Sequence, residues 1–554
     1  DVFLIDHAWT TTTGTAHEQL ETLPGLLERM ERLAEMRGVL VPLLEADRTT
    51  QLEHEHEQRV DRMYDAMWAL NSQYVVRGPD GDEVAPWFVM DEVGTAVTHC
   101  GPDEAPNSAC VPFVDVRSGT AYSLLWPTRD IEPGDLVTRD FAAGVTDPLT
   151  RSVALLPYGP SVSATEPLDA AALAQHAAKC DEADAATTAA HKVGPPPALP
   201  PALAQRALHT FGERQQQQPP QPVRVWSDSK LLCRFLTRRE FVFVDEQSAA
   251  DVIWQGTEDF RDYAALREHV FVNQLPNEVC VCQKQRLAAT VAAAYGGPRA
   301  VEWLPETYDL TRELARFVAR YRERAHKGED NHWIVKPCNA ARSRDIVVTA
   351  NEACAVQLGR GAVPVVASKY VEQPACYEGR KFDLRFLVYA RAERGWPRPQ
   401  FALYNTFWIR FANKPYALTR LWDYEQHFTV MNYRAGSAMT HIRDTQFVPW
   451  FDRTHGAGAW DRVHAEVRAV LAQLFHAACE VGGLGGCSAG AGCSADAFAV
   501  YGVDLLLTQD LHVRIEEVNF GPDCTRACDY DADFYNKTFG YFFFGELENV
   551  TRFL

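Results

Sequence analysis

Three oxygen-bearing side chains near the carboxyl end have the types and spacing of a magnesium site. Asp504 lies in one apolar run and Glu517 in the next, and a short polar break at 509–511 separates the runs. This pattern predicts a β-hairpin, in which cross-strand neighbours lie about 5 Å apart. Asn519 follows Glu517 by two residues and therefore points the same way. Two carboxylates and an amide on one face suit Mg²⁺ held against phosphates; two solvated acids at a strand end are the alternative.

A second run, 381–388, alternates charged and apolar residues. Lys381, Asp383 and Arg385 share one face of the predicted strand, and apolar side chains form the other. Lys and Arg would hold phosphate oxygens, Arg with two parallel bonds. Asp383 would orient one of these cations or approach a substrate amine. A solvated strand face is the alternative.

Two other apolar runs end in a lysine. Lys336 precedes a proline at the end of one run, where it could neutralise an α-phosphate. Lys369, Tyr370 and Val371 end the other run, where extended backbone could read the edge of an adenine and Lys369 could approach the ring. The alternatives are a surface lysine at a strand end for Lys336 and, favoured when the motif is taken alone, an ordinary edge strand for Lys369 to Val371.

The elements that must position these residues fall into a multidomain chain. With 554 residues the chain is too long for one core, so two or three domains are expected. Residues 1–160 combine an apolar start, a helical stretch and short strands. Residues 161–222 are rich in Ala, Pro and Gln and predict a linker. Residues 223–554 alternate predicted strands and helices, so the expected fold class is α/β and α+β multidomain.

Composition limits the partners and the compartment. The net charge of −20 opposes nonspecific binding to nucleic acid or to anionic membranes. No apolar run reaches membrane-span length, and no signal-peptide pattern opens the chain. The 14 cysteines lack disulfide-like or paired metal-ligand spacing, which predicts reduced thiols in the cytoplasm. The first residue is Asp1 rather than Met, which suggests a fragment or a trimmed chain.

Several motifs together resemble one protein family. WIVKP, SKYVEQP, GRKFDLRFLV and VYGVDLLL followed by IEEVN occur in the order and approximate spacing of the tubulin-tyrosine-ligase-like proteins. Segments around Arg410, around His427 and Thr429, and from 272 to Lys284 also resemble that family. The resemblance covers residues 223–554 and implies an ATP-grasp fold.

The resemblance implies a chemistry and a role for each matched residue. In this family ATP activates a carboxylate as an acyl-phosphate, and an amine then attacks to form a peptide or isopeptide bond. Asp383 would lie by the ribose or the incoming amino acid, Arg385 by the γ-phosphate and acyl-phosphate, and Arg410 by the amino-acid carboxylate. The implied ATP-binding residues are Lys284, Lys336 and Lys381 at the phosphates, and Lys369, Tyr370 and Val371 at the adenine. The implied Mg²⁺ ligands are Asp504, Glu517 and Asn519.

The chain departs from the family pattern at two places. The loop after Lys336 lacks the usual glycines that let backbone approach phosphate. Arg342 and Arg344 would then serve as side-chain phosphate contacts, or the loop is degraded. Val430 stands where the family has an asparagine. We therefore expect nucleotide binding to be better preserved than catalysis.

The amino-terminal region resembles a SET domain. Residues 126–141 are similar to the segment that closes the lysine-methyltransferase site, but Phe141 stands at the position of the usual tyrosine. Residues 98–100 are at most a remnant of the segment that holds S-adenosylmethionine. This predicts a SET-like domain without methyl transfer, with an unrelated β-rich domain as the alternative. The combination of both regions resembles the type-twelve branch of the family.

These observations support three functional hypotheses. The first is an ATP-binding protein that regulates or takes part in the modification of tubulin tails and has lost ligase activity. The second is an active ligase that joins tyrosine, glutamate or glycine to tubulin or another protein. The third is a SET-type methyltransferase or a histone-binding regulator.

Charge bears on the expected partners. Tubulin or microtubules are expected from the resemblance, whereas the acidity also suits basic histone tails; direct nucleic-acid and membrane binding are not expected. Cations between Arg312 and Lys327 could dock an acidic tail or form a solvated helix face. The expected location is the cytoplasm, with the nucleus or microtubules as further sites.

Overall fold

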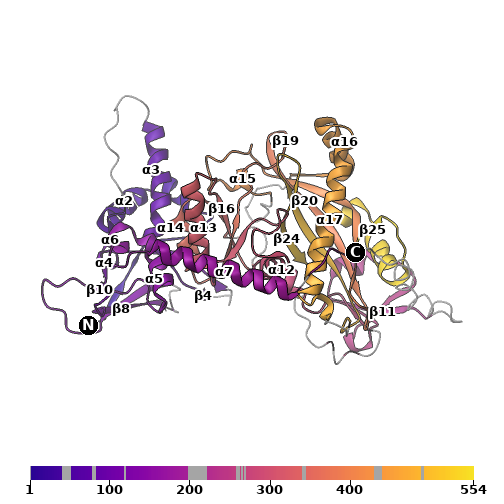
Figure 1. Cartoon of the computed structure of the whole chain (residues 1–554), viewed down its shortest axis with the longest axis horizontal. Coiled ribbons are helices and arrows are strands. Elements are labelled where there is room, and N and C mark those ends of the chain that lie inside the picture. Colours follow the sequence, from indigo (N-terminus) through magenta and orange to yellow (C-terminus); the bar gives the residue numbers. More distant parts are fainter. Residues whose placement is uncertain are drawn as a thin grey trace. The chain divides into compact units, whose positions relative to one another are not determined.

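The computed structural model describes most of the chain in two compact units. The described residues are 2–39, 52–77, 83–115, 117, 120–191, 193–196, 221–256, 263, 266, 270–339, 345–429, 440–487 and 492–554. Unit 1 comprises Asp1–Glu182, Thr307–Tyr370 and Leu418–Tyr424. Unit 2 comprises Ala183–Glu306, Val371–Ala417 and Glu425–Leu554. Figure 1 shows the elements coloured along the sequence.

The amino-terminal part of unit 1 is built from short strands and helices. One antiparallel sheet has the order β1–β9–β8, with β1 (Phe3–Ile5), β9 (Thr120–Pro127) and β8 (Ser108–Asp115). A second has the order β2–β6–β3, with β2 (His7–Thr11), β6 (Trp87–Met90) and β3 (Asn71–Gln73). Two pairs complete the strands: β7 (Thr98–His99) with β10 (Thr138–Arg139), and β4 (Val76–Arg77) with β5 (Glu83–Val84). The helices are α1 (Ala16–Thr22), α2 (Leu26–Arg37), α3 (Leu52–Ala66), α4 (Glu92–Ala96), α5 (Pro148–Leu155) and α6 (Pro160–Ser163).

The rest of unit 1 is a four-stranded antiparallel sheet with two helices. The strand order is β15–β18–β16–β17, with β15 (Thr307–Asp309), β18 (Val365–Lys369), β16 (Trp333–Pro337) and β17 (Val347–Thr349). The helices are α13 (Leu314–Lys327) and α14 (Glu352–Gly359). α14 begins at Asn351, whose side chain accepts hydrogen bonds from the first turn. One hydrophobic core joins both parts of unit 1, because Trp68 and Trp333 belong to the same buried cluster.

Unit 2 is organised around one large sheet. Its main path runs β12–β11–β13–β14–β23–β20–β21–β22, and β19, β24 and β25 pair with β20, β23 and β21. The strands are β11 (Val223–Ser227), β12 (Phe241–Phe243), β13 (Val252–Trp254), β14 (Phe271–Val272), β19 (Cys376–Tyr377), β20 (Arg380–Ala392), β21 (Gln400–Phe411), β22 (Thr440–Arg443), β23 (Ala497–Leu507), β24 (Val513–Phe520) and β25 (Val550–Arg552).

Helices of unit 2 cover this sheet. They are α10 (Lys230–Phe235), α11 (Val279–Cys282), α12 (Lys284–Tyr295), α16 (Asp444–His455), α17 (Ala459–Glu480), α18 (Thr525–Tyr530) and α19 (Phe534–Phe539). Figure 1 shows α17, in orange, lying across the sheet that contains β20 and β24. Val467 and Leu471 of α17 are buried in the same core as Phe386 of β20, because the apolar positions of the helix recur at helical spacing on one face.

The predicted fold class and the predicted hairpin are confirmed. The structure mixes helices and strands in several domains, and β23 and β24 are antiparallel with Asp504 opposite Glu517. Part of the predicted linker, 170–191, forms the helix α7 (Ala170–His191), and 197–220 lie outside the described residues. No helix in the described ranges is long and apolar enough to cross a membrane. All of the cysteines are free thiols.

Candidate magnesium and nucleotide site

The three predicted metal ligands meet on the hairpin of unit 2. The Asn519 amide nitrogen lies 3.0 Å from Glu517 Oε1 and 3.4 Å from Asp504 Oδ2. A β-bulge after Asp504 shifts the register of β24, so Glu517 pairs with Asp504 and Ile515 with Leu505. The predicted meeting of these three side chains on one face is confirmed. Asp504 is buried, whereas Glu517 and Asn519 are half-buried.

Two neighbouring strands bring the catalytic candidates to the same place. Asp383 of β20 pairs with Arg410 of β21, and Arg385 of β20 pairs with Asp504 of β23. Both guanidinium groups donate two bonds: Arg410 binds the Asp383 carboxylate at 2.6 and 2.7 Å, and Arg385 binds both oxygens of Asp504. Arg410 Nη2 also lies 3.0 Å from Asp504 Oδ2. The alternative of a solvated strand face is wrong, because Asp383 is only 2% exposed.

Charge neutralisation explains why so many ionic groups can be buried together. Burial alone would lower the pKa of Arg410, but the charges of Asp383 and Asp504 outweigh it and raise the pKa well above its usual value. The two carboxylates therefore favour the cationic form of Arg410. Buried charges persist when they are paired and hydrogen-bonded in this way. The arrangement holds the guanidinium groups rigidly at the carboxylates.

Two lysines flank this cluster in unit 2. Lys284, at the start of α12, lies 3.2 Å from Glu517 Oε2. Lys381 on β20 is 4% exposed, and burial lowers its pKa, an effect that Glu516 and Asp383 partly oppose. Both lysines are thus close to the acids of the hairpin and could turn to phosphate oxygens.

Three contributions to this site were not predicted. Glu516 occupies the bulge of β24 and acts on Lys381, and only the register shift reveals this. Thr429 donates its hydroxyl to Asp383 Oδ2 and fixes that carboxylate. Gly502 leaves room for Arg385, because a Cβ there would lie 3.2 Å from Arg385 Nη1 and 2.8 Å from Pro522. The Thr429 motif was visible in the sequence, but its partner was not.

The remaining nucleotide-binding candidates lie mainly in unit 1. Lys336 is the next-to-last residue of the buried strand β16 and is 8% exposed. Lys369, at the end of β18, binds Asp330 at 2.5 Å and donates to the Tyr370 carbonyl at 3.0 Å. Tyr370 is buried, and its backbone N–H donates to His332. The predicted strands are confirmed, and the adenine and phosphate roles stay predictions.

Three sequence features of this region have different outcomes. Val371 begins the next segment of unit 2. The predicted phosphate contacts Arg342 and Arg344 lie outside the described residues, as does Val430. The substitution of side-chain contacts for a glycine loop therefore stays a prediction.

The donor set on the hairpin fits Mg²⁺ chemically. Mg²⁺ takes oxygen ligands at about 2.0–2.1 Å in an octahedron, which places neighbouring ligands about 2.9 Å apart. The contacts of Asn519 with Glu517 and Asp504, at 3.0 and 3.4 Å, are close to that spacing. Rotating the Asn519 amide by half a turn would direct its oxygen to the same point. Asp504, Glu517 and Asn519 would therefore hold the ion, which would supply charge neutralisation for phosphates.

The SET-like region contains a cluster of three potential metal ligands, two of which already bind other protein groups. His99, Cys100 and Asp140 have ligand atoms within 4.8 Å of one another. However, His99 Nδ1 accepts the Phe141 N–H, and His99 Nε2 lies 3.3 Å from Glu166. Arg151 binds both oxygens of Asp140 at 2.8 Å. His99 and Asp140 are therefore part of a hydrogen-bonded network that stabilises the fold.

Replacing Arg151 by Met is expected to destabilise unit 1 by about 1.5–3 kcal/mol, because Arg151 binds both Asp140 and Glu166. Burial raises the pKa of Asp140, but Arg151 outweighs it and the net shift is downward; Arg151 also lowers the pKa of Glu166. This stabilisation is fully present above about pH 4.5 and is lost as pH falls through the lowered pKa values. Thermal unfolding between pH 3 and 7 measures it.

The exposed Arg129 provides the control for that variant. Arg129→Met removes the same charge and should leave the unfolding midpoint unchanged. An Arg151→Met midpoint equal to the wild type at pH 7, or a deficit that grows below pH 4, would contradict the assignment.

The cations of α13 are paired with acids rather than grouped as a docking patch. Arg316 binds Asp181 at 2.6 Å, Arg322 binds Glu352 at 2.8 Å, and Lys327 binds Glu323 at 2.6 Å. These contacts offset the positive charge that an acidic tail would need. The helix therefore does not support a free basic patch, whereas the side chains of Arg322 and Lys327 are partly exposed, as the alternative of a solvated face predicts.

Comparison with known proteins identifies the class. The model of the tubulin-tyrosine ligase family matches residues 264–543, and that of the tubulin tyrosine ligase SET-like domain matches residues 1–162. The chain belongs to the tubulin-tyrosine ligase family. Members of this family are ATP-grasp-like and generally depend on ATP and Mg²⁺.

Individual relatives agree with this assignment. Tubulin–tyrosine ligase-like protein 12 of Mus musculus is 36% identical and covers 100% of this chain and 82% of its own length. Its Homo sapiens counterpart is 36% identical over 98% of this chain and 80% of its own length. A probable tubulin polyglutamylase, TTLL9 of Rattus norvegicus, is 24% identical over 53% of this chain and 73% of its own length. The predicted resemblance to the SET-containing branch is confirmed.

Proposed function

We propose that this protein binds Mg²⁺-ATP and regulates, or takes part in, the modification of tubulin tails, with ligase turnover lost. The observation that carries the proposal is the cluster on β20, β21, β23 and β24, where Arg385 and Arg410 face the acids Asp383 and Asp504. Such preorganised charges offset the charge that develops during phosphoryl transfer. Tubulin as the partner is supported by relatives described as tubulin polyglutamylases.

The same cluster also supports the second candidate, an active amino-acid ligase. When Mg²⁺-ATP binds, Arg385 would exchange its protein carboxylate for a phosphate group, and Arg410 would exchange its own for the amino-acid carboxylate. Each guanidinium can bind such groups bidentately. The glycine-free loop after Lys336 favours the first candidate, since backbone without glycine approaches phosphate poorly.

Methyl transfer by the SET-like region receives less support. Phe141 packs 5.3 Å from His99 and 4.6 Å from Tyr158 between ring centroids, and it has no hydroxyl group. Binding of basic histone tails would suit the acidic chain and stays the third candidate. We place the protein in the cytoplasm, with nuclear or microtubule association as further locations.

Two measurements on one preparation test the proposal. Calorimetry measures Mg²⁺-dependent ATP binding, and radiolabelled tyrosine, glutamate and glycine report incorporation into tubulin. Binding without incorporation is expected. Binding with incorporation would establish the active ligase instead, and no binding at all would contradict both candidates and leave an interaction module.

A further inference from the structure

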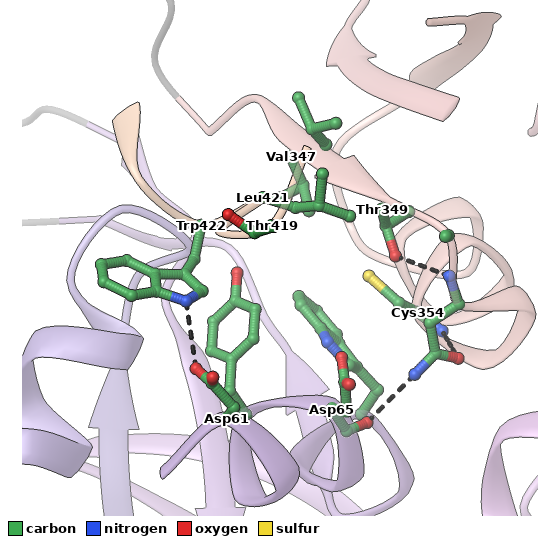
Figure 2. Close-up of a pocket in the computed structure, with 13 residues that line it drawn as sticks. Asp61, Asp65, Val347, Thr349, Cys354, Thr419, Leu421 and Trp422 are labelled. Atoms are coloured by element: carbon green, nitrogen blue, oxygen red, sulfur yellow. Dashed lines mark hydrogen bonds between the residues drawn. The ribbon is translucent and has the colours of Figure 1, made fainter. Parts of the chain in front are cut away.

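Unit 1 contains a cavity of about 290 Å³ that the proposed ATP chemistry does not use. Three segments line it: helix α3, the stretch from β17 to α14, and the segment 418–424. Figure 2 shows Asp61 and Asp65 projecting from α3, with Val347 and Leu421 above them and Trp422 beside Asp61. All three segments belong to unit 1.

The cavity is acidic. Asp61 and Asp65 are four residues apart on α3 and therefore share one face of the helix. No lysine, arginine or histidine is among the described residues that line the cavity. His17 and Trp422 both bind Asp61 at Oδ1, at 2.8 and 3.1 Å, which leaves Oδ2 on the cavity side without a hydrogen bond from a described residue. The cavity thus presents carboxylate oxygens of both Asp61 and Asp65, and no lysine or arginine is among its described lining residues.

Asp65 shows what the cavity lacks. Desolvation of the Asp65 carboxyl by the surrounding protein raises its pKa, the charge of Asp61 adds to this effect, and a hydrogen bond from the Asn351 side chain opposes it. A bound cation would favour the charged form and reverse this shift.

Aromatic rings form the other walls. Tyr64 of α3, Trp68 of the 3-10 turn that follows it (Met67–Ala69) and Trp422 of the facing segment line the cavity. His17 stacks on Trp422 at 3.5 Å between ring centroids, which holds the indole in place. Trp68 is 1% exposed, and its indole N–H makes no hydrogen bond within the described part of the chain. The cavity therefore offers ring faces for a cation and one buried donor for an acceptor.

We propose that this cavity binds the side chain of an unmodified lysine on a basic protein segment. Cations are attracted to aromatic faces and to carboxylates, and the apolar stem of lysine can lie along Val347 and Leu421. A primary ammonium group has three donors for Asp61 and Asp65, which a quaternary group lacks. A peptide carbonyl of the same ligand would accept the Trp68 N–H. The net charge of −20 favours encounter with a basic segment.

The full-length chain tests this with four matched probes. Nα-acetyl-lysine-N-methylamide is the positive probe, its Nε-acetyl form removes the charge, its Nε-trimethyl form removes the donors, and n-butylammonium lacks the peptide groups. Ligand-observed NMR gives the affinity for each. We expect the first probe to bind at least tenfold more tightly than each of the others.

One variant localises the binding. Asp65→Asn should weaken the first probe at least tenfold with the unfolding midpoint unchanged, whereas Glu55→Gln, an exposed acid on the same helix, should leave affinity unchanged. Equal binding of the Nε-acetyl form, or an unaffected Asp65→Asn protein, would overturn the proposal. Equal binding of n-butylammonium would overturn the peptide assignment in favour of a free amine, and tighter binding of the trimethyl form would overturn the unmodified lysine. The result does not depend on ATP binding.

Discussion

Replacing Glu517 by Gln is expected to abolish Mg²⁺-dependent ATP binding while the fold stays intact. Glu517 lies opposite Asp504 on the hairpin and beside Asn519, so it is the half-exposed carboxylate of the proposed metal set. The amide is isosteric and keeps a hydrogen-bond acceptor, but it removes the negative charge that a divalent ion requires. Calorimetry with and without Mg²⁺ measures the change. We expect affinity to fall at least about a hundredfold, because replacing a residue that only supports a metal ligand already costs up to about that much.

The control for this variant lies on the same hairpin. Asp510→Asn removes the same charge from the exposed turn and should bind Mg²⁺-ATP like the wild type. Circular dichroism and the unfolding midpoint establish that both variants are folded. If Glu517→Gln binds Mg²⁺-ATP with wild-type affinity, the metal assignment is wrong, although the ATP site itself would be upheld.

Replacing Arg410 by Met should destabilise the sheet of unit 2 by about 3–5 kcal/mol, the usual cost of removing one partner from a buried ion pair. Arg410 is 6% exposed and binds both Asp383 and Asp504, so its loss leaves Asp383 buried without a cationic partner. Hydrogen exchange at β20 and β21 peptides, together with urea unfolding, measures the effect in the relevant region.

Two further variants separate charge from packing. Arg394→Met changes an exposed arginine just beyond β20 and should have little effect. The double variant Arg410→Met, Asp383→Leu removes both partners and should recover much of the stability, because an apolar pair of similar size can replace a buried ion pair. A single Arg410→Met variant as stable as the wild type would show that the cluster does not support the fold.

Local pattern predicted the elements of the candidate site well. Alternation from 381 to 388 predicted β20, and two apolar runs around a polar break predicted the hairpin of β23 and β24, because the period of side-chain direction in a strand depends only on the backbone. The ends of the strands were less accurate, since β20 continues to Ala392. The Arg-to-Asp pairs were not predicted. Arg385 and Asp504 are separated by 119 positions, and no local rule determines that spacing.

The sequence by itself determined the family, the strands and the types of side chain available for phosphate and metal chemistry, because these depend on local periodicity and on ordered motifs. Only the tertiary structure decided how the charges are compensated. Strand register placed Arg385 on Asp504 and Arg410 on Asp383, and a bulge turned Glu516 towards Lys381. The tertiary structure also brought α3 and the segment 418–424 together around an acidic, aromatic cavity. Pairing across long sequence separations reflects the packing of one core, and that packing is a property of the whole folded unit.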